Sequence, residues 1–316
     1  MDSLYGFALY GITLLTMGGI FALLSLGLNI QWGYTGLFNA GIAGFVAIGA
    51  YVSAILTTAP SPLHLGGFDQ PLLVGGIAAM VLSGLVAWVV ARICLRLRAD
   101  YLAIATIGIG EILRLIFKNE SWATNGARGI VKVPKAFESL PAPMDQLAFL
   151  ALVLAVVSIV YLLLERAHIS PWGRLIAAIR DDEQAAAAAG KDVVQLRIQS
   201  FILGAVLMGL AGAFLAQYLK FIGPNATDPL TTTFLVWVML IAGGSGSNRG
   251  AILGAFLIWA IWSMTEILAG ILPGDLALRV SHVRIFIVGL ALQIILQRFP
   301  QGIVPENRPN ITGGSS

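Results

Sequence analysis

The chain has 316 residues, of which 58% are hydrophobic and 11% carry a charge. Soluble domains are about 45–50% apolar and about 25% charged, so this composition excludes a protein that is exposed mostly to water. The formal net charge of +3 comes from basic residues that lie mostly beside apolar runs, which indicates topology signals and no nucleic-acid partner. The single cysteine, Cys94, excludes an internal disulfide and a cysteine-based metal cluster.

Apolar runs long enough to span a membrane follow one another along the sequence. A spanning helix needs about 17–25 predominantly apolar residues. We expect nine such segments, near residues 4–28, 36–58, 71–95, 101–117, 147–164, 198–220, 233–247, 251–272 and 283–299. The segment 233–247 is short and ends in a glycine-rich stretch, so it can be broken or re-entrant, and the count is eight to ten. The predicted fold class is an all-α, polytopic membrane bundle in which residues 1–316 form one domain.

Basic residues predict the orientation of these segments. Arg92, Arg96 and Arg98 follow the third segment and a basic connection at about 166–197 follows the fifth, so both are expected in the cytoplasm. Alternation then places the 118–146 connection on the outer side of the membrane, although it contains Lys118, Arg128, Lys132 and Lys135. The first segment lacks the basic region of a cleavable signal peptide, so we expect it to remain as a helix. Nine spans place the N-terminus outside, and one re-entrant segment would reverse this.

A polar stretch interrupts the N-terminal region, which has no Asp, Glu, Lys or Arg from Ser3 to Phe68. This stretch contains Gly33 and Gly36 and should break the helix. Backbone groups freed inside a membrane must line a cavity or be buried in protein. A cavity of this kind could pass an amino-acid zwitterion, and its candidate lining residues are Asn29, Gln31, Thr35 and Asn39. A short loop between two spans is an equally good interpretation.

Glu111 is an ionisable residue inside the fourth apolar segment, which makes it a functional candidate by default. Arg114 follows at the spacing that places both side chains on one helix face. We favour a structural ion pair toward the outer end of the helix. A role in gating or in contact with a binding protein is the alternative.

The longest cytoplasmic connection predicts a short helix outside the membrane. Asp181, Asp182 and Glu183 suit a helix N-terminus, the glutamine and alanines that follow are strong helix formers, and Gly190 suits a C-terminal cap. Because an alanine face has no bulky side chains, a groove of another protein could close tightly on it. The interpretation is a docking element, and a surface linker without a partner is the alternative.

Small residues recur four apart in two segments. One set is Ala205, Gly209 and Ala213, and this spacing lets membrane helices approach closely. The abundance of glycine and alanine in any membrane helix is the alternative explanation. The second region of expected helix packing contains Gly243, Gly244, Gly246, Gly250 and Gly254.

Several motifs occur in order along the chain. They are Leu26–Asn39 with Gly49–Tyr51, Arg98–Gly108 with Glu111, Gln184-Ala185-Ala186 with Gly190, and Gly243–Gly246 with Gly250 and Gly254. The third is similar to the Glu-Ala-Ala-x-x-x-Gly loop by which permeases of ABC importers dock on their ATPase subunits, with Gln184 in the place of Glu. The others resemble the LivM-type permease of branched-chain amino-acid ABC transporters. The resemblance covers roughly residues 20 to 260.

The resemblance implies a multi-pass permease subunit of a bacterial ABC importer in the cytoplasmic (inner) membrane. Such a subunit forms the translocation path for branched-chain or other hydrophobic amino acids. The implied partners are a second homologous permease, two ABC ATPase subunits, a periplasmic solute-binding protein and membrane lipid. Thr106 and Glu111 join the candidate path. The implied coupling residues are Arg174, Arg180, Asp181, Asp182, Glu183, Gln184, Ala185, Ala186 and Gly190.

The sequence has no Gly-x-x-x-x-Gly-Lys-[Ser/Thr] phosphate loop. We therefore expect that the chain is not an enzyme and binds no cofactor or metal, with ATP and Mg²⁺ on the partner ATPase subunits. Ile42 stands where many relatives have His, and urea, short amides or other amino acids are alternative solutes. A stand-alone secondary transporter or channel is the alternative of another class. A membrane enzyme is a third, for which the spans offer no plausible nucleophile or metal cluster.

Overall fold

Helices make up most of the chain in the computed structural model, which describes residues 2–97, 99–271 and 274–306. In these ranges, nine helical segments overlap the nine expected apolar runs, so the predicted all-α, polytopic architecture is confirmed. The segments are α1 (Asp2–Leu28), α2 (Ile42–Thr57), α3 (Leu72–Cys94), α4 (Ala99–Asn119), α6 (Met144–Ile169), α9 (Val193–Leu219), α10 (Leu235–Gly243), α11 (Asn248–Ile271) and α12 (Gly274–Arg298).

The segments differ in how well they suit a membrane. In the part of the chain that the structure describes, five helices are long and apolar enough to cross one: Gly6–Tyr34, Leu72–Cys94, Met144–Ile169, Val193–Leu219 and Pro224–Gly243. The apolar α2 has only 16 residues, and α4 is amphipathic because it carries Glu111, Arg114 and Lys118. Nine is therefore an approximate number of spans.

Shorter elements connect these helices. A two-stranded antiparallel ribbon pairs Ile130 with Ile222 and Val131 with Phe221, which ties the 118–146 connection to the end of α9. The other short elements are the π-helix η1 (Asn29–Tyr34), α5 (Ser121–Thr124), η2 (Gly126–Arg128), β1 (Ile130–Val131), α7 (Pro171–Asp181), α8 (Glu183–Ala188), β2 (Phe221–Ile222), η3 (Pro224–Thr227) and the π-helix η4 (Leu230–Phe234).

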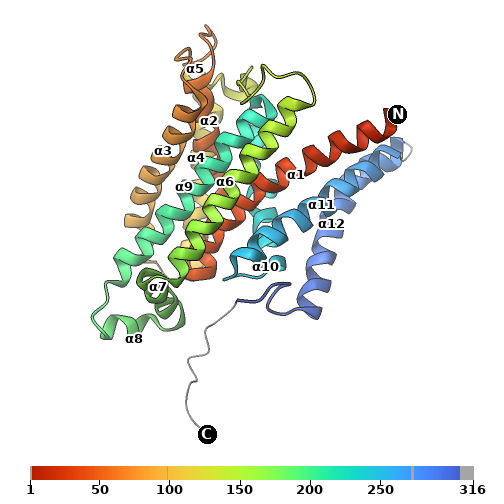
Figure 1. The fold of residues 1–316 in the computed structure, drawn as a ribbon. Coiled ribbons are helices and arrows are strands. Elements are labelled where there is room, and N and C mark those ends of the chain that lie inside the picture. The colour runs from red at the N-terminus through yellow and green to blue at the C-terminus, as the bar shows by residue number, and fades with distance from the viewer. Residues whose placement is uncertain (1, 98, 272–273, 307–316) are drawn as a thin grey trace.

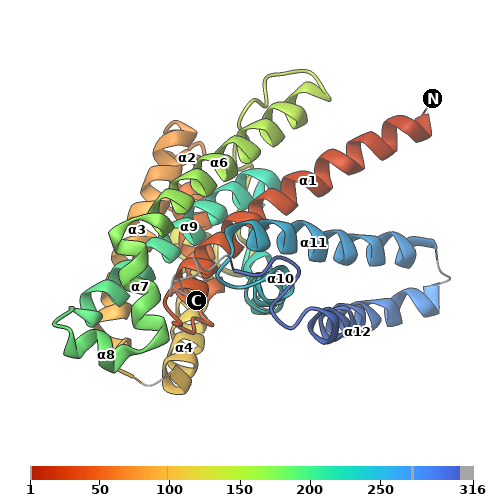
Figure 2. The ribbon, with the colours of Figure 1, turned by 60° about the horizontal axis from the view of Figure 1, so that its bottom comes forward.

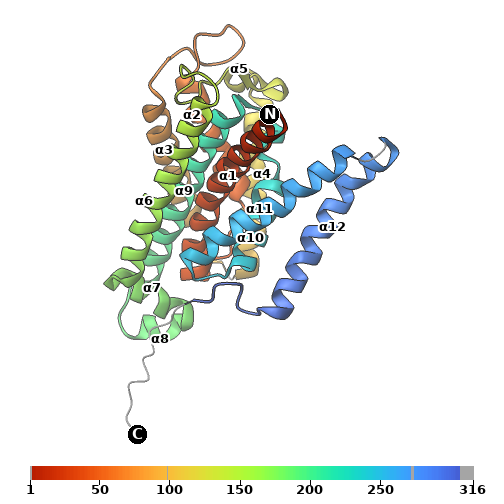
Figure 3. The same cartoon turned by 45° about the vertical axis from the view of Figure 1, so that its right-hand side comes forward.

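The bundle has two distinct ends (Figure 1). The N-terminus of α1 and the connection around α5 lie at one end, and α7 and α8 lie at the other, as the predicted alternation requires. The helices α2, α3 and α9 pack together, while α10 and α11 pack against α1 on the other side. The hairpin of α11 and α12 diverges from the rest of the bundle (Figures 2 and 3).

Small residues allow the close approach of α2, α3 and α9. A Cβ atom added at Gly209 would lie 2.7 Å from Cβ of Ser83 and 2.8 Å from the carbonyl oxygen of Ala79, both on α3. On its other side, the carbonyl of Gly209 contacts Gly49 of α2. The backbones of three helices therefore meet at Gly209, as the spacing of small residues predicts for membrane helices.

Candidate functional site

The first helix changes form where the sequence becomes polar. The α-helix ends at Leu28, a π-helix covers Asn29–Tyr34, and the chain has no regular secondary structure from Gly36 to Gly41. The hydroxyl of Thr35 lies 2.9 Å and 2.7 Å from the carbonyl oxygens of Ile30 and Gln31 and donates to them. Gly36 has φ +69°, a conformation that glycine adopts without steric cost. The helix is therefore broken where the sequence predicts it, through a π-helical turn.

The polar side chains of this segment bond to protein in the conformation seen here. Asn29 is fully buried, donates to Oδ1 of Asn248 (3.1 Å) and accepts from the backbone N–H of Gly246 (2.8 Å). Gln31 is also buried and donates to the carbonyl of Phe201 (2.8 Å). Buried polar groups need such partners. These bonds join the break in α1 to α9 and to the turn before α11.

Asn39 and Thr106 fix the start of α2. The Asn39 amide donates to Oε1 of Gln31 (2.8 Å), and the Asn39 carbonyl accepts from Nε1 of Trp237 (3.1 Å). The hydroxyl of Thr106 accepts from the backbone N–H of Ala40 (3.1 Å). Ile42, the first residue of α2, is fully buried. The candidate path residues Asn29, Gln31, Thr35, Asn39 and Thr106 are thus gathered in one buried polar network.

Replacing Gln31 with Met is expected to destabilise this network. The change leaves the amide of Asn39 without its acceptor, at about 1–3 kcal/mol for an unpaired buried group, and removes the bond to the Phe201 carbonyl. We expect a lower thermal midpoint in detergent, measured by intrinsic fluorescence. Gln195→Met on the exposed start of α9 is the matched control and should leave the midpoint unchanged. An equal midpoint for both variants would contradict the structural role of Gln31.

Glu111 lies apart from this network. Its carboxylate pairs with Arg114, with Nη2 of Arg114 at 2.6 Å from Oε1. Nη1 of Arg114 also donates to the carbonyl of Pro224 at 3.5 Å. The structure therefore forms the ion pair that the spacing favours, and it links α4 to the segment before α10.

Two capped helices form the connection between α6 and α9. The Ser170 hydroxyl accepts from the N–H of Gly173 at the start of α7, and the Asp182 carboxylate accepts from the N–H of Ala185 (2.9 Å) at the start of α8. After α8, Gly190 has φ +74°. These are the N-cap and C-terminal glycine that local sequence favours. The predicted short helix is present as α8.

The side chains of this connection divide into those that hold it and those that are exposed. Arg174 donates to the carbonyl of Ile169 (2.9 Å), and Glu183 pairs with Arg197 (2.8 Å). Ala186 is buried against Ile179 and Val193. Exposed on α8 and after it are Gln184, Ala185, Ala187, Ala188 and Gly190. Apart from Glu183 and Gln184 in its first turn, the exposed surface of α8 is made of alanine side chains.

Arg180 points from α7 toward the break in α1. Its Nη1 donates to the carbonyl of Gly33, and its Nη2 lies 3.0 Å and 2.9 Å from the two carboxylate oxygens of Glu306. Nε of Arg180 also lies 3.8 Å from Asp181. The side chain is 17% exposed and that of Glu306 is 14% exposed. Arg180 therefore joins α7, the π-helix and the segment after α12 at one point.

A cavity of 870 Å³ opens beside this junction, at the end of the bundle that holds α7 and α8. The ring of Phe38 stacks on Trp237 with centroids 4.2 Å apart, and Trp32 packs edge-on against both rings. The cavity is lined by Trp32, Gly33, Gly36, Arg180, Ser245, Pro300, Gln301 and Glu306. Of the aromatic cluster, Trp32 borders the cavity, together with Gly33 and Gly36 of the unwound segment.

The glycines after α10 serve two purposes. A Cβ atom at Gly254 would lie 2.8 Å from Cα of Gly243, and one at Gly250 would lie 2.7 Å from the Gly243 carbonyl, so these three let α10 and α11 touch. Gly244 and Gly246 lie instead in the turn between the helices, with φ +120° and +86°.

Within the described residues, no group of three or more His, Cys, Asp and Glu side chains could hold a metal ion.

The sequence profile of the permease component of branched-chain amino acid transport systems matches residues 11–295. The chain belongs to this permease family. It is therefore the transport subunit of an ABC importer and not an enzyme, since ATP hydrolysis lies in other subunits of such systems.

Curated relatives agree with this family. The permease is 29% identical to the high-affinity branched-chain amino acid transport system permease protein LivM of Salmonella typhimurium, over 95% of this chain and 71% of the relative. It is 27% identical to the probable branched-chain amino acid transport permease protein LivM of Methanocaldococcus jannaschii, over 93% and 92%. It is also 24% identical to LivH of Salmonella typhimurium, over 77% and 80%. No solved structure matches the chain.

Sequence reasoning about the permease missed several residues of the junction. Glu306 follows the last helix, and nothing in its local sequence indicates a partner on α7. Asn248 and Thr233 were also missed, although both bond to the network around α2 and the break. The aromatic residues Trp32 and Phe38 stand beside the polar stretch, and this alternation of aromatic and polar residues is the signal that could have indicated a packed break.

Proposed function

We propose that this permease carries branched-chain or other hydrophobic amino acids across the bacterial cytoplasmic (inner) membrane. A second homologous permease completes the path, two ABC ATPase subunits bind ATP and Mg²⁺, and a periplasmic solute-binding protein delivers the solute. The chain itself binds neither nucleotide nor metal. Similarity to both LivM and LivH, whose names describe the same transport system, supports the solute class and the pairing with a second permease.

The observation that carries the proposal is the connection of α7 and α8. The exposed α8 offers short side chains to a groove, and α7 continues through Arg180 to the break in α1. A force applied to α8 by an ATPase subunit therefore has a short physical route to the unwound segment. The opposite end of the bundle faces the periplasm and the solute-binding protein.

Docking at α8 is tested by Ala188→Trp. Ala188 is exposed, so the new indole does not disturb the small cluster beneath the helix, whereas Asp182→Lys would remove the cap and Gly190→Trp would strain a residue at φ +74°. We expect the amount of ATPase that copurifies with the permease to fall by about tenfold, because the indole keeps a groove from closing. Uptake of radiolabelled leucine should fall with it.

The matched control is Ser139→Trp, an exposed position in the 118–146 connection. It should leave the amount of copurified ATPase unchanged. Unchanged copurification and uptake in Ala188→Trp would reject α8 as the docking element. A native preparation that contains no ATPase even after cross-linking would instead favour a stand-alone transporter, and an uptake panel with urea and short amides tests the alternative solutes.

A further inference from the structure

A second cavity lies at the other end of the bundle, between the outer halves of α1, α6 and α9. Its volume is 310 Å³, at the lower end of the about 300–1,000 Å³ that is typical of small-molecule sites. Polar groups of Thr16, Lys135, Gln146 and Tyr218 line it together with the apolar side chains of Ile12 and Phe149. The cavity thus combines polar and apolar walls in a space suited to a small solute.

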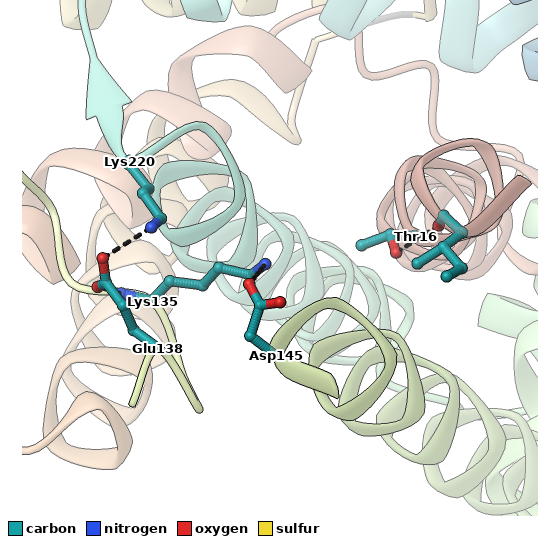
Figure 4. A network of polar contacts seen from close by, with 6 residues as sticks. Thr16, Lys135, Glu138, Asp145 and Lys220 are labelled. Atoms are coloured by element: carbon teal, nitrogen blue, oxygen red, sulfur yellow. Dashed lines mark hydrogen bonds and ion pairs between the residues drawn. The ribbon is translucent and has the colours of Figure 1, made fainter. Parts of the chain in front are cut away.

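Lys135 is the unusual member of this lining. It belongs to the basic 118–146 connection, yet its side chain is only 9% exposed. Its Nζ lies 3.5 Å from Oδ2 of Asp145 (Figure 4). The same Nζ lies 5.1 Å from the centroid of the Phe149 ring. An ammonium has three donors, and the contact with Asp145 is long. Lys135 can therefore donate further hydrogen bonds to a ligand, at a position that is largely shielded from water.

Asp145, which lies next to Lys135, offers a hydrogen-bond acceptor. Its Oδ1 is buried and has no hydrogen-bond partner among the described residues. A buried carboxylate oxygen without a partner is costly, so this atom is suited to accept from a bound donor. The neighbouring pair of Lys220 and Glu138 differs: its N···O distance is 2.7 Å, and the two side chains are 46% and 51% exposed (Figure 4). The Lys220 ammonium holds the pKa of Glu138 below its usual value.

We propose that this cavity is a binding site for a free amino acid in its zwitterionic form, on the outer side of the permease. The α-carboxylate binds Nζ of Lys135, the α-ammonium binds Oδ1 of Asp145, and the side chain lies against Ile12 and Phe149. A ligand that carries both charges satisfies both groups and leaves the site neutral. The inference rests on the proposed function, because it assigns the solute class and the outer side to this end.

The test is binding of tritiated L-leucine, without ATP, to the complex of permease and ATPase subunits, purified in lipid nanodiscs without the solute-binding protein. We expect saturable binding by the native complex. Lys135→Gln and Asp145→Asn should each weaken it by about tenfold or more, since each removes one charge-assisted contact. Lys135→Arg should retain binding. The matched control, Lys220→Gln, removes a lysine from the neighbouring exposed pair with Glu138 and should bind as the native complex does.

Competition on the native complex tests the chemistry without any variant. Isoamylamine lacks the carboxylate and 4-methylpentanoate lacks the ammonium, so neither should displace leucine, whereas L-isoleucine and L-valine should. The competition experiment tests the zwitterion site even if Lys135→Gln or Asp145→Asn does not fold. Thermal midpoints and gel filtration report whether each variant folds.

Three results would overturn the inference: no leucine binding by the native complex, native binding in a folded Lys135→Gln variant, or displacement of leucine by the amine or the acid alone. Retention of phosphatidylethanolamine that depends on Lys135, in place of leucine binding, would assign the cavity to a lipid headgroup. The proposed function fails by a different result, the absence of ATPase subunits and of ATP-dependent leucine uptake.

Discussion

ATP-dependent leucine uptake is expected to fall by about tenfold in Arg180→Gln, which corresponds to about 1.4 kcal/mol at 25 °C. Arg180 is the contact between α7 and the break in α1, since it donates to the carbonyl of Gly33. Glutamine is too short and uncharged to keep both this bond and the paired bonds to Glu306. Movement of α7 would then no longer be transmitted to the π-helix. The measurement is uptake into proteoliposomes that contain the complete importer.

Stability must be separated from transmission in this experiment. Loss of one partner from a buried ion pair costs about 3–5 kcal/mol, and partial exposure of Arg180 and Glu306 reduces that cost. The double variant Arg180→Gln, Glu306→Gln removes the uncompensated carboxylate, so its thermal midpoint should rise toward the native value while uptake stays low. Arg92→Gln, on the exposed end of α3, is the control for loss of a positive charge. Recovery of uptake in the double variant would show that the link to Gly33 is dispensable.

Gly209→Leu is expected to prevent assembly of the bundle. A side chain at Gly209 would meet Ser83 and Ala79 of α3, and the Gly209 carbonyl already contacts Gly49 of α2. Overpacking costs about 1–3 kcal/mol where side chains can move aside, and here backbone atoms stand in the way. We expect almost no monodisperse protein in fluorescence-detected gel filtration.

The matched control for this prediction is Gly76→Leu on α3. A Cβ atom at Gly76 has no neighbour within 4 Å, so the same substitution should leave the gel-filtration profile unchanged. Gly209→Ala should give an intermediate yield of monodisperse protein, because one methyl group requires a smaller shift of α3. A monodisperse Gly209→Leu protein with native stability would show that α2, α3 and α9 do not pack as closely as the structure places them.

The break in α1 and the coupling connection together suggest how the permease converts contact with an ATPase into movement. A π-helical turn inside an α-helix is rare and is frequent at functional sites. Here it is held by side chains from distant segments. Asn29 holds it to Gly246 and Asn248, Gln31 holds it to α9, and Arg180 holds Gly33 to α7. A shift of α7 changes one of these three attachments, which would bias the position of the segment that leads to α2.

Local sequence was sufficient for the helices, for the position of the break and for the caps of α8. Apolar length decides which segments form spanning helices, and Asp182 and Gly190 act on backbone groups within a few residues. The sequence also indicated the pairing of Glu111 with Arg114, because a helix brings residues three apart onto one face. The π-helical form of the break did not follow, since it depends on neighbours that hold Asn29 and Gln31.

What only the tertiary structure decided is the set of partners for the polar groups. Arg180 and Glu306 are 126 residues apart in the sequence, and their pairing requires the segment after α12 to return to α7. Among the basic residues of the 118–146 connection, the sequence gives no reason to single out Lys135, which the packing of α6 buries beside Asp145. Helix formation is governed by the length of the apolar segment and by local hydrogen bonds. The pairing of buried charges depends instead on how whole helices pack, which no local sequence pattern predicts.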